Sequence, residues 1–291
     1  MKPRTRALLL LHFIVFLWGF TGILGKELHF SVFVLVALRM LIALVSIGLY
    51  AMVAKKSLVL PKRDVLKLIG VGVLTSCHWC AFFYSIHKSN VSTTLSVIST
   101  TAFFVALISP FFNKSKLKLK ELSLGVLVIV GIAIIFSSGF QYATGIIYSL
   151  IAALLAAVFS SFNGRFIQRI PATPIAFYEM LGGSLVMVGM ITWNQEWNVV
   201  SALKAYDWML LILLGTATTA FAFIASVQVM KHLSPFTCAM AINLEPVYTI
   251  VFALLIYGSS EYMSGVFYFG AAIILIALFA ESLLKNKKSS N

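Results

Sequence analysis

The sequence predicts an all-α integral membrane protein with ten transmembrane helices. Hydrophobic residues make up 60% of the 291 residues, only 11% are charged, and the mean hydropathy is +0.99, which excludes an ordinary soluble domain. Ten apolar runs each approach the roughly 20 residues that a spanning helix needs. Runs such as LGVLVIVGIAIIF (124–136) are continuous rather than alternating, so they satisfy their backbone hydrogen bonds as helices and not as strands of a membrane barrel.

The predicted spans follow one another with short connections. They cover residues 7–25, 32–54, 66–87, 92–112, 121–138, 144–166, 174–193, 207–230, 236–257 and 263–284. The first run follows basic residues, as the apolar part of a signal peptide would, but no A-x-A-like site follows it and nine more spans come after it. We therefore expect it to be the first helix, uncleaved.

The basic residues predict the orientation in the membrane. With the N-terminus in the cytoplasm, most of the 22 Lys and Arg residues lie in inside segments, and the outside loops hold only Lys26, Lys88 and Lys204. The positive-inside rule then predicts a multi-pass plasma (inner) membrane protein with both termini cytoplasmic. The net charge of +13 is explained by short loops that face anionic membrane lipid, so no nucleic-acid partner is expected.

An internal repeat predicts two domains. A shift of 144 residues places HKSNVSTTLSVISTTAFFVAL (87–107) on KHLSPFTCAMAINLEPVYTIV (231–251), and a shift of 140 places ELSLGV (121–126) on EYMSGV (261–266). Each copy would hold five helices, and an odd number of helices reverses the orientation of the second copy. We therefore predict two inverted five-helix repeats, residues 1–142 and 143–291.

Three ionisable residues fall inside predicted spans, namely Arg39, Glu179 and Glu245. A charge at the bilayer centre costs roughly 2.5 to 3.5 kcal/mol on insertion scales, so each must face protein or a watery cavity. Under the shift of 140 residues, Arg39 and Glu179 become counterparts in the two repeats. Glu245 precedes Pro246, whose missing amide donor is expected to bend the ninth helix near residue 242.

Polar and aromatic residues near these charges are the other candidates for a substrate cavity or a coupling step. Asn243 and Tyr248 lie near the expected bend, and Thr101 lies at the equivalent level of the fourth span. The third span contributes a face with a histidine at mid-bilayer. The further candidates are Trp18, His78, Trp79 and Tyr178.

Arg39, Glu245 and His78 each have two interpretations. Glu245 lines the cavity in a proton-linked or gating step, or it holds two helices together by hydrogen bonds, including one to Arg39. Arg39 binds a substrate carboxylate or phosphate, or it forms that buried pair. His78 serves proton coupling, or it is a neutral imidazole bonded to a neighbouring helix. Cys77 and Cys80 form a CxxC within apolar helix, where packing rather than metal or disulfide chemistry is expected.

Four stretches resemble the EamA-like family of the drug/metabolite transporter superfamily. They are FLWGFTG (16–22), LRMLIA (38–43), YSIHKSNVSTTLSVISTTAFFVAL (84–107) and MKHLSPFTCAMAINLEPVYTIVFALLIYGSSE (230–261). The resemblance covers nearly the whole chain. It implies a ten-helix carrier with a central cavity, generally an exporter of amino acids or other small metabolites.

The chain departs from the family pattern in the fourth span. The family often has proline where this chain has Thr101 and Ala102, and an acidic residue after that span where it has Asn113 and Lys114. The first half therefore need not behave as the second half does.

The functional expectation is a secondary transporter that exports small metabolites, amino acids above all, by alternating access through a central cavity between the repeats. The alternatives are a drug, nucleoside or nucleotide-sugar carrier of the same superfamily, and a channel-like facilitator. No G-x-S-x-G, H-E-x-x-H or P-loop motif is present, so no enzymatic activity, cofactor or metal is expected. The partners are a small-molecule substrate and lipid, with proton coupling and the choice between monomer and homodimer left open.

Overall fold

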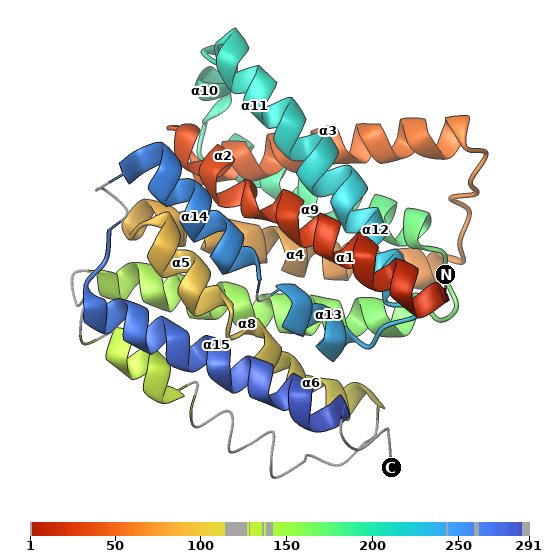
Figure 1. Cartoon of the computed structure of the whole chain (residues 1–291). Coiled ribbons are helices and arrows are strands. Elements are labelled where there is room, and N and C mark those ends of the chain that lie inside the picture. Colours follow the sequence, from red (N-terminus) through yellow and green to blue (C-terminus); the bar gives the residue numbers. More distant parts are fainter. Residues whose placement is uncertain are drawn as a thin grey trace.

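The protein is a bundle of long helices (Figure 1). The structure, a computed structural model, describes residues 2–113, 127, 129–135, 137, 142–242, 244–258 and 262–286. Every regular element in these ranges is a helix, and no strand occurs among them. Within the described residues, eight helical segments, some of them divided into two helices, are long and apolar enough to cross a membrane. The predicted all-α membrane class is therefore confirmed at this level.

The N-terminal half contains two long uninterrupted helices and two spans that are each divided into two helices. Its elements are α1 (Pro3–Gly19), α2 (Thr21–Glu27), α3 (Val32–Val53), α4 (Lys62–Lys88), α5 (Val91–Ile98) and α6 (Thr101–Asn113). These positions agree with the first four predicted spans. Helix α4 starts four residues before the predicted run, directly after Pro61. Hydropathy does not detect these four residues because the first turn of the helix is polar.

The C-terminal half has the same mixture of continuous and divided helices. Its elements are α8 (Ala143–Phe166), α9 (Ala172–Trp193), α10 (Trp197–Ser201), α11 (Ala205–Gly215), the π-helical segment η2 (Thr216–Phe221), α12 (Ala222–Val229), α13 (Pro235–Ile242), α14 (Glu245–Tyr257) and α15 (Gly265–Asn286). They match the sixth to tenth predicted spans. The fifth predicted span, 121–138, lies mostly outside the described residues.

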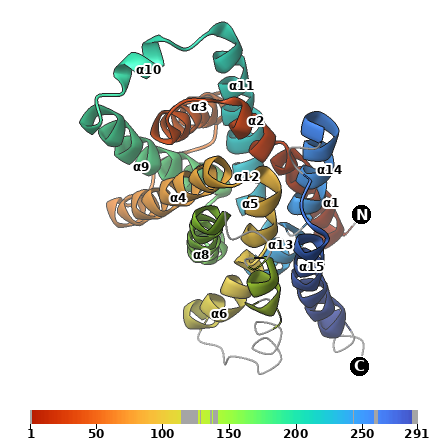
Figure 2. The ribbon, with the colours of Figure 1, turned by 90° about the vertical axis from the view of Figure 1, so that its left-hand side faces the viewer.

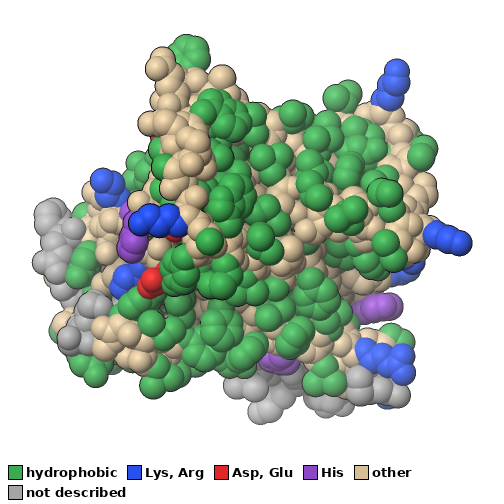
Figure 3. Space-filling view, turned by 90° about the horizontal axis from the view of Figure 1, so that it is seen from above, with side chains coloured by type: hydrophobic (Ala, Val, Ile, Leu, Met, Phe, Trp, Pro, Cys, Tyr) green, Lys and Arg blue, Asp and Glu red, His purple; other side chains and the backbone are tan. Residues whose placement is uncertain are grey.

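Apolar side chains cover the outer surface of the bundle. Figure 3 shows one face on which hydrophobic side chains dominate, with the charged side chains lying toward opposite sides of the view. Large apolar residues such as Val53 and Leu255 are 85% and 78% exposed. Soluble monomers rarely expose contiguous apolar patches on this scale, whereas lipid tails would cover them.

Helices from the two ends of the sequence pack side by side. Helix α1 contacts α12 and α14, and α4 packs against both α8 and α9, which in turn packs against α3. Figure 2 shows α3, α4 and α9 on one side of the bundle and α1, α14 and α15 on the other, with α5 and α12 between them. Helices from both halves of the chain thus lie next to one another, as a site shared by both halves requires.

The fourth and ninth spans are interrupted at their centres. Helix α5 ends at Ile98 and α6 begins at Thr101, while α13 ends at Ile242 and α14 begins at Glu245. Pro246 is the second residue of α14, where a missing amide donor costs nothing because that donor would have no partner inside the helix. The backbone of Pro246 therefore starts a new helix instead of kinking a continuous one.

Candidate functional site

A cavity of about 110 Å³ lies inside the bundle and is lined by residues from both halves of the chain. Its polar lining consists of Thr21, Arg39, His78, Ser99, Thr101, Ser160, Asn163, Ser226 and Glu245, and its aromatic lining of Trp18, Trp79, Phe82, Phe159 and Phe223. This volume holds only about four water molecules. Sites for small molecules usually measure about 300 Å³ or more, so a metabolite requires the helices to separate.

Arg39 of α3 is the cation of this cavity. Its side chain is 2% exposed, and its Nε donates a hydrogen bond of 2.6 Å to Thr219 Oγ1. The guanidinium carbon lies 4.0 Å from the centre of the Trp79 ring, a cation–π distance. Nη1 is buried and has no hydrogen-bond partner, so one donor of the fork remains available to a ligand.

The partners of Arg39 and Trp18 come from the π-helical segment η2. Thr218 and Thr219 donate their hydroxyls to the carbonyl of Leu214 at 2.9 and 2.6 Å. The backbone carbonyl of Thr218 accepts a hydrogen bond of 2.9 Å from the indole of Trp18. Segments of π-helix occur frequently at functional sites. Thr219 was not among the predicted site residues, although the run TATTAF (216–221) of small polar residues within an apolar span was a usable signal.

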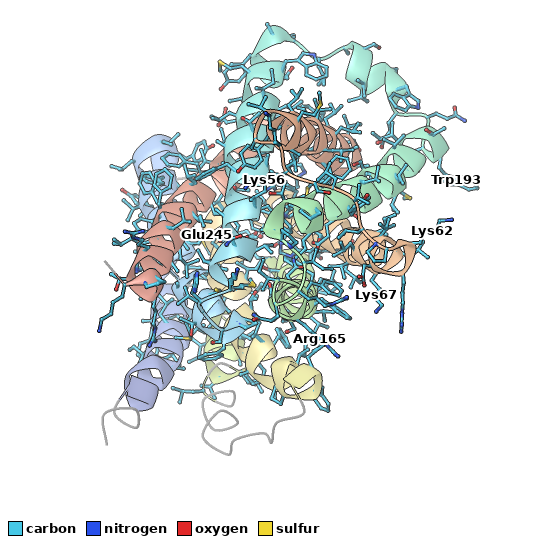
Figure 4. All side chains as sticks on the ribbon, turned by 90° about the vertical axis from the view of Figure 1, so that its right-hand side faces the viewer. Lys56, Lys62, Lys67, Arg165, Trp193 and Glu245 are labelled. Atoms are coloured by element: carbon cyan, nitrogen blue, oxygen red, sulfur yellow. The ribbon has the colours of Figure 1, made fainter. Side chains whose placement is uncertain are left out.

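Glu245 contributes the carboxylate of the cavity. It is the first residue of α14 and lines the cavity together with Arg39, and Figure 4 shows it inside the bundle. The two charges are near enough to act on one another electrostatically. Among the described residues, however, no direct ion pair joins them. A carboxylate and a guanidinium therefore share one cavity without neutralising each other by contact.

Three further candidates also line this cavity. The Nδ1 atom of His78 donates to the carbonyl of Ala152 at 2.8 Å, and its ring packs against Phe159. Trp79 is the ring beside Arg39, and Thr101 follows the break in the fourth span, where its hydroxyl donates to the carbonyl of Ile98 at 2.7 Å. His78 is thus fixed by a backbone carbonyl on α8 and still borders the cavity.

The remaining candidates lie elsewhere. Tyr178 donates its hydroxyl to the carbonyl of Leu58 at 3.0 Å, and Tyr248 packs edge to face on Phe16 at 5.7 Å; neither lines the cavity. Asn243 lies outside the described residues.

Glu179 is completely buried beside the cavity and accepts a hydrogen bond from Asn163, which does line it. Asn163 was missed because a single asparagine near a helix end carries no distinctive pattern. The two cysteines of the CxxC lie in different environments, since Cys77 is exposed and Cys80 is buried and contacts Met187.

A helical bundle with an apolar exterior and a charged interior cavity has the architecture of a membrane transporter. The model of the EamA-like transporter family matches residues 5–137 and 143–282, one match in each half. The chain belongs to the EamA-like transporter family.

Two relatives agree with this assignment, and one solved structure has the same fold. The uncharacterized transporter YxxF of Bacillus subtilis (strain 168) is 23% identical over 260 residues, which cover 86% of this chain and 81% of that protein. An uncharacterized transporter of Archaeoglobus fulgidus is 32% identical over 102 residues, 35% of this chain and 37% of that protein. A crystal structure with 16% identity aligns with a TM-score of 0.70 over 96% of this chain and 98% of its own, which shows the same fold.

Proposed function

We propose that the protein exports small amphipathic metabolites, amino acids above all, by alternating access through the central cavity. The observation that carries this proposal is the unpartnered Nη1 of Arg39 in a cavity that also contains Glu245. A guanidinium suits a carboxylate, and the carboxylate of Glu245 suits an ammonium group. The rings of Trp79 and Phe223 suit an apolar side chain between these charges.

The helix breaks support the proposed architecture of ten helices in two inverted repeats, residues 1–142 and 143–291. The helices that follow the two breaks begin at Thr101 and at Glu245, positions that are related by the 144-residue shift that aligns the two sequence segments. The family model also matches once in each half. Broken helices place free backbone groups near the centre of the membrane, where carriers with inverted repeats bind their substrates.

One end of the bundle is closed by contacts between α14 and the first span. The hydroxyl of Tyr257 donates to Glu27 Oε1 at 2.7 Å, and the rings of Phe20 and Phe252 stack with their centres 4.4 Å apart. Thr249 adds a hydrogen bond of 2.9 Å to the carbonyl of Gly19. We propose that this is the outer end and that α14 separates from α1 and α2 when the carrier opens outward.

The charge distribution supports the proposed orientation in a plasma (inner) membrane, with both termini cytoplasmic. Lys56, Lys62, Lys67 and Arg165 are exposed and are labelled in Figure 4, which views the bundle from the right-hand side of Figure 1, away from α14. Basic side chains gather on the cytoplasmic side of membrane proteins.

A thermal-shift screen of the purified protein tests the substrate class. Amino acids, nucleosides and cationic drugs are compared, because a ligand at 100 times its Kd stabilises a protein by roughly 2.7 kcal/mol. Each amino acid that raises Tm is then tested as its methyl ester and as its N-acetyl derivative. We expect both derivatives to lose the stabilisation, since the ester lacks the carboxylate for Arg39 and the acetyl form lacks the ammonium for Glu245.

The alternatives give different results. Stabilisation by nucleosides or cationic drugs but not by amino acids would favour another carrier class of the superfamily. Unchanged binding of the methyl ester would remove Arg39 as the carboxylate partner. In proteoliposomes, a carrier shows saturable exchange of labelled for unlabelled substrate, whereas flux that does not saturate would indicate a channel-like facilitator.

A further inference from the structure

A second polar cluster lies beside the cavity, where α4, α8 and α9 meet. Its centre is Glu179, whose side chain is completely buried. Glu179 Oε2 accepts hydrogen bonds from Asn163 Nδ2 at 3.3 Å and from Thr75 Oγ1 at 3.5 Å. Asn163 is itself buried and lines the cavity. One side chain therefore separates Glu179 from the cavity and contacts both.

Two oxygen atoms of this cluster have no hydrogen-bond partner. They are Glu179 Oε1 and Asn163 Oδ1, and both are buried. If the carboxyl group is ionised, both atoms are acceptors and cannot bond to each other. A proton on Oε1 turns the carboxylic acid into a donor toward the amide oxygen while Oε2 still accepts from the amide nitrogen. A single proton would therefore satisfy both atoms in one acid–amide ring.

Helices α3 and α12, which both pack against α9, offer no counter-charge to Glu179. Helix α9 packs against α3, α4 and α12. On α3, the guanidinium of Arg39 is bonded to η2 and stacked on an indole ring. Helix α12, AFIASVQV, contains no titratable residue.

The groups on α4 and α8 also leave Glu179 without a cation. On α4, His78 donates to a backbone carbonyl of α8, and the Cys80 thiol contacts α9 at Met187. On α8, Arg165 is exposed. The side-chain partners of Glu179 are thus the neutral Asn163 and Thr75. A carboxylate that is buried without a cation is costly and is neutralised instead.

We propose that Glu179 is a proton-binding site of this carrier and that Asn163 connects its protonation to the cavity. Loss of the proton leaves two acceptor oxygens unsatisfied, and Asn163 relieves this by turning its amide oxygen into the cavity. There the oxygen adds an acceptor for a ligand ammonium group. A metal cation would need more oxygen ligands than this cluster supplies. The coupling step rests on the proposed transport function, whereas the bound proton does not.

Infrared spectroscopy of the purified protein at neutral pH tests the bound proton without transport. We expect wild type to show the carbonyl stretch of a protonated carboxylic acid that shifts in D₂O, and Glu179→Gln to lack it. Glu196→Gln, which removes a carboxylate from the loop between α9 and α10, should retain the band. A wild-type spectrum identical to that of Glu179→Gln would overturn the proposal.

Transport assays test the coupling step. In proteoliposomes, Glu179→Gln should lose accumulation driven by a pH gradient and keep substrate exchange, because glutamine forms the same two hydrogen bonds permanently. If a pH gradient drives the accumulation of substrate equally well in Glu179→Gln and in wild type, the proposed coupling is refuted. If Na⁺ raises the Tm of wild type but not that of Glu179→Gln, the ion bound at Glu179 is a metal cation and not a proton.

The outcomes separate this inference from the proposed function. If wild type transports nothing yet shows the acid band, the proton site stands and the transport proposal fails. If wild type transports substrate but shows no acid band, the transport proposal stands and the proton site fails. Should Glu179→Gln not fold, Asn163→Ala keeps the carboxyl group but removes the amide, and the band should then shift in frequency; an unshifted band would contradict the acid–amide ring.

Discussion

The guanidinium carbon of Arg39 lies 4.0 Å from the centre of the Trp79 ring, while Arg39 Nε is bonded to Thr219 at 2.6 Å. These two contacts hold the planar group from its face and from one edge. The other edge carries Nη1, which has no partner. Arg39 is therefore positioned by these contacts without a direct ion pair among the described residues, as its proposed role in binding a carboxylate requires.

Replacing the ring beside Arg39 should weaken ligand binding. Trp79→Leu removes the aromatic face, so we expect Kd for a carboxylate ligand to rise about two- to thirtyfold, as a cation–π energy of about 0.5 to 2 kcal/mol implies. Trp79→Phe should lose less. Titration by thermal shift measures the change, and Trp193→Leu is the control because Trp193 is 84% exposed at the end of α9 (Figure 4). Equal losses in Trp79→Leu and Trp193→Leu would contradict this role.

The carboxylate in the cavity gives a second prediction. Glu245→Gln keeps the shape of the side chain but removes its charge, so it should abolish or uncouple transport and leave Tm without ligand nearly unchanged. Saturable flux in proteoliposomes is the measurement, with Glu196→Gln as the control for loss of a carboxylate. Saturable flux that equals wild type at every pH would remove Glu245 from the mechanism.

The structural alternative for the same pair has its own signature. If Arg39 and Glu245 mainly held helices together, Arg39→Ala and Glu245→Ala would lose expression equally. In the structure, Arg39 is hydrogen-bonded to η2 instead, and no direct ion pair joins Arg39 to Glu245 among the described residues. We therefore expect Arg39→Ala to lower expression more than Glu245→Ala does.

Hydropathy alone predicted the helical membrane class and the positions of the spans that lie within the described residues, because lipid requires every spanning segment to be apolar and helical. It could not predict that the first span is divided at Phe20 or that residues 216–221 form π-helix. The π-helical segment also forms a contact between distant parts of the chain, the hydrogen bond from Trp18 to Thr218, which the sequence does not show.

The candidate site shows a similar division. Arg39 and Glu245 were predicted because charged residues inside a span are rare, since inserting a charge into the bilayer costs free energy. Both residues line the cavity. Tyr178 and Tyr248 were selected by their neighbours in sequence, and each bonds or packs elsewhere. Asn163 was missed, since uncharged polar residues are common in helices and only packing places it beside a charge. Thr219 was missed although the run TATTAF (216–221) marked its segment as polar.

An ion pair between α4 and the segment after α8 gives a stability prediction. Arg169 donates two hydrogen bonds to Asp64, from Nη1 to Oδ2 at 2.9 Å and from Nη2 to Oδ1 at 2.8 Å. Such paired geometry is stronger than a single contact. Asp64→Asn should therefore lower Tm, and Arg169→Gln should lower it by a similar amount, with little further loss in the double variant. Arg165→Gln controls for the loss of a basic charge, and full additivity of the two changes would contradict the pairing.

Glycine at position 72 allows α4 and α9 to touch at Glu179. A Cβ on Gly72 would collide with the backbone carbonyl of Glu179, and the Cα of Glu179 would lie only 2.8 Å from it. Gly70, two residues earlier on the same helix, has nothing within 4 Å of such a Cβ. Gly72→Ala must push the helices apart and should cost about 1 to 3 kcal/mol, whereas Gly70→Ala should be neutral or stabilise by up to about 1 kcal/mol. Equal Tm values for the two variants would show that α4 and α9 do not meet there, and a larger Tm loss in Gly72→Ala would confirm the contact that encloses Glu179.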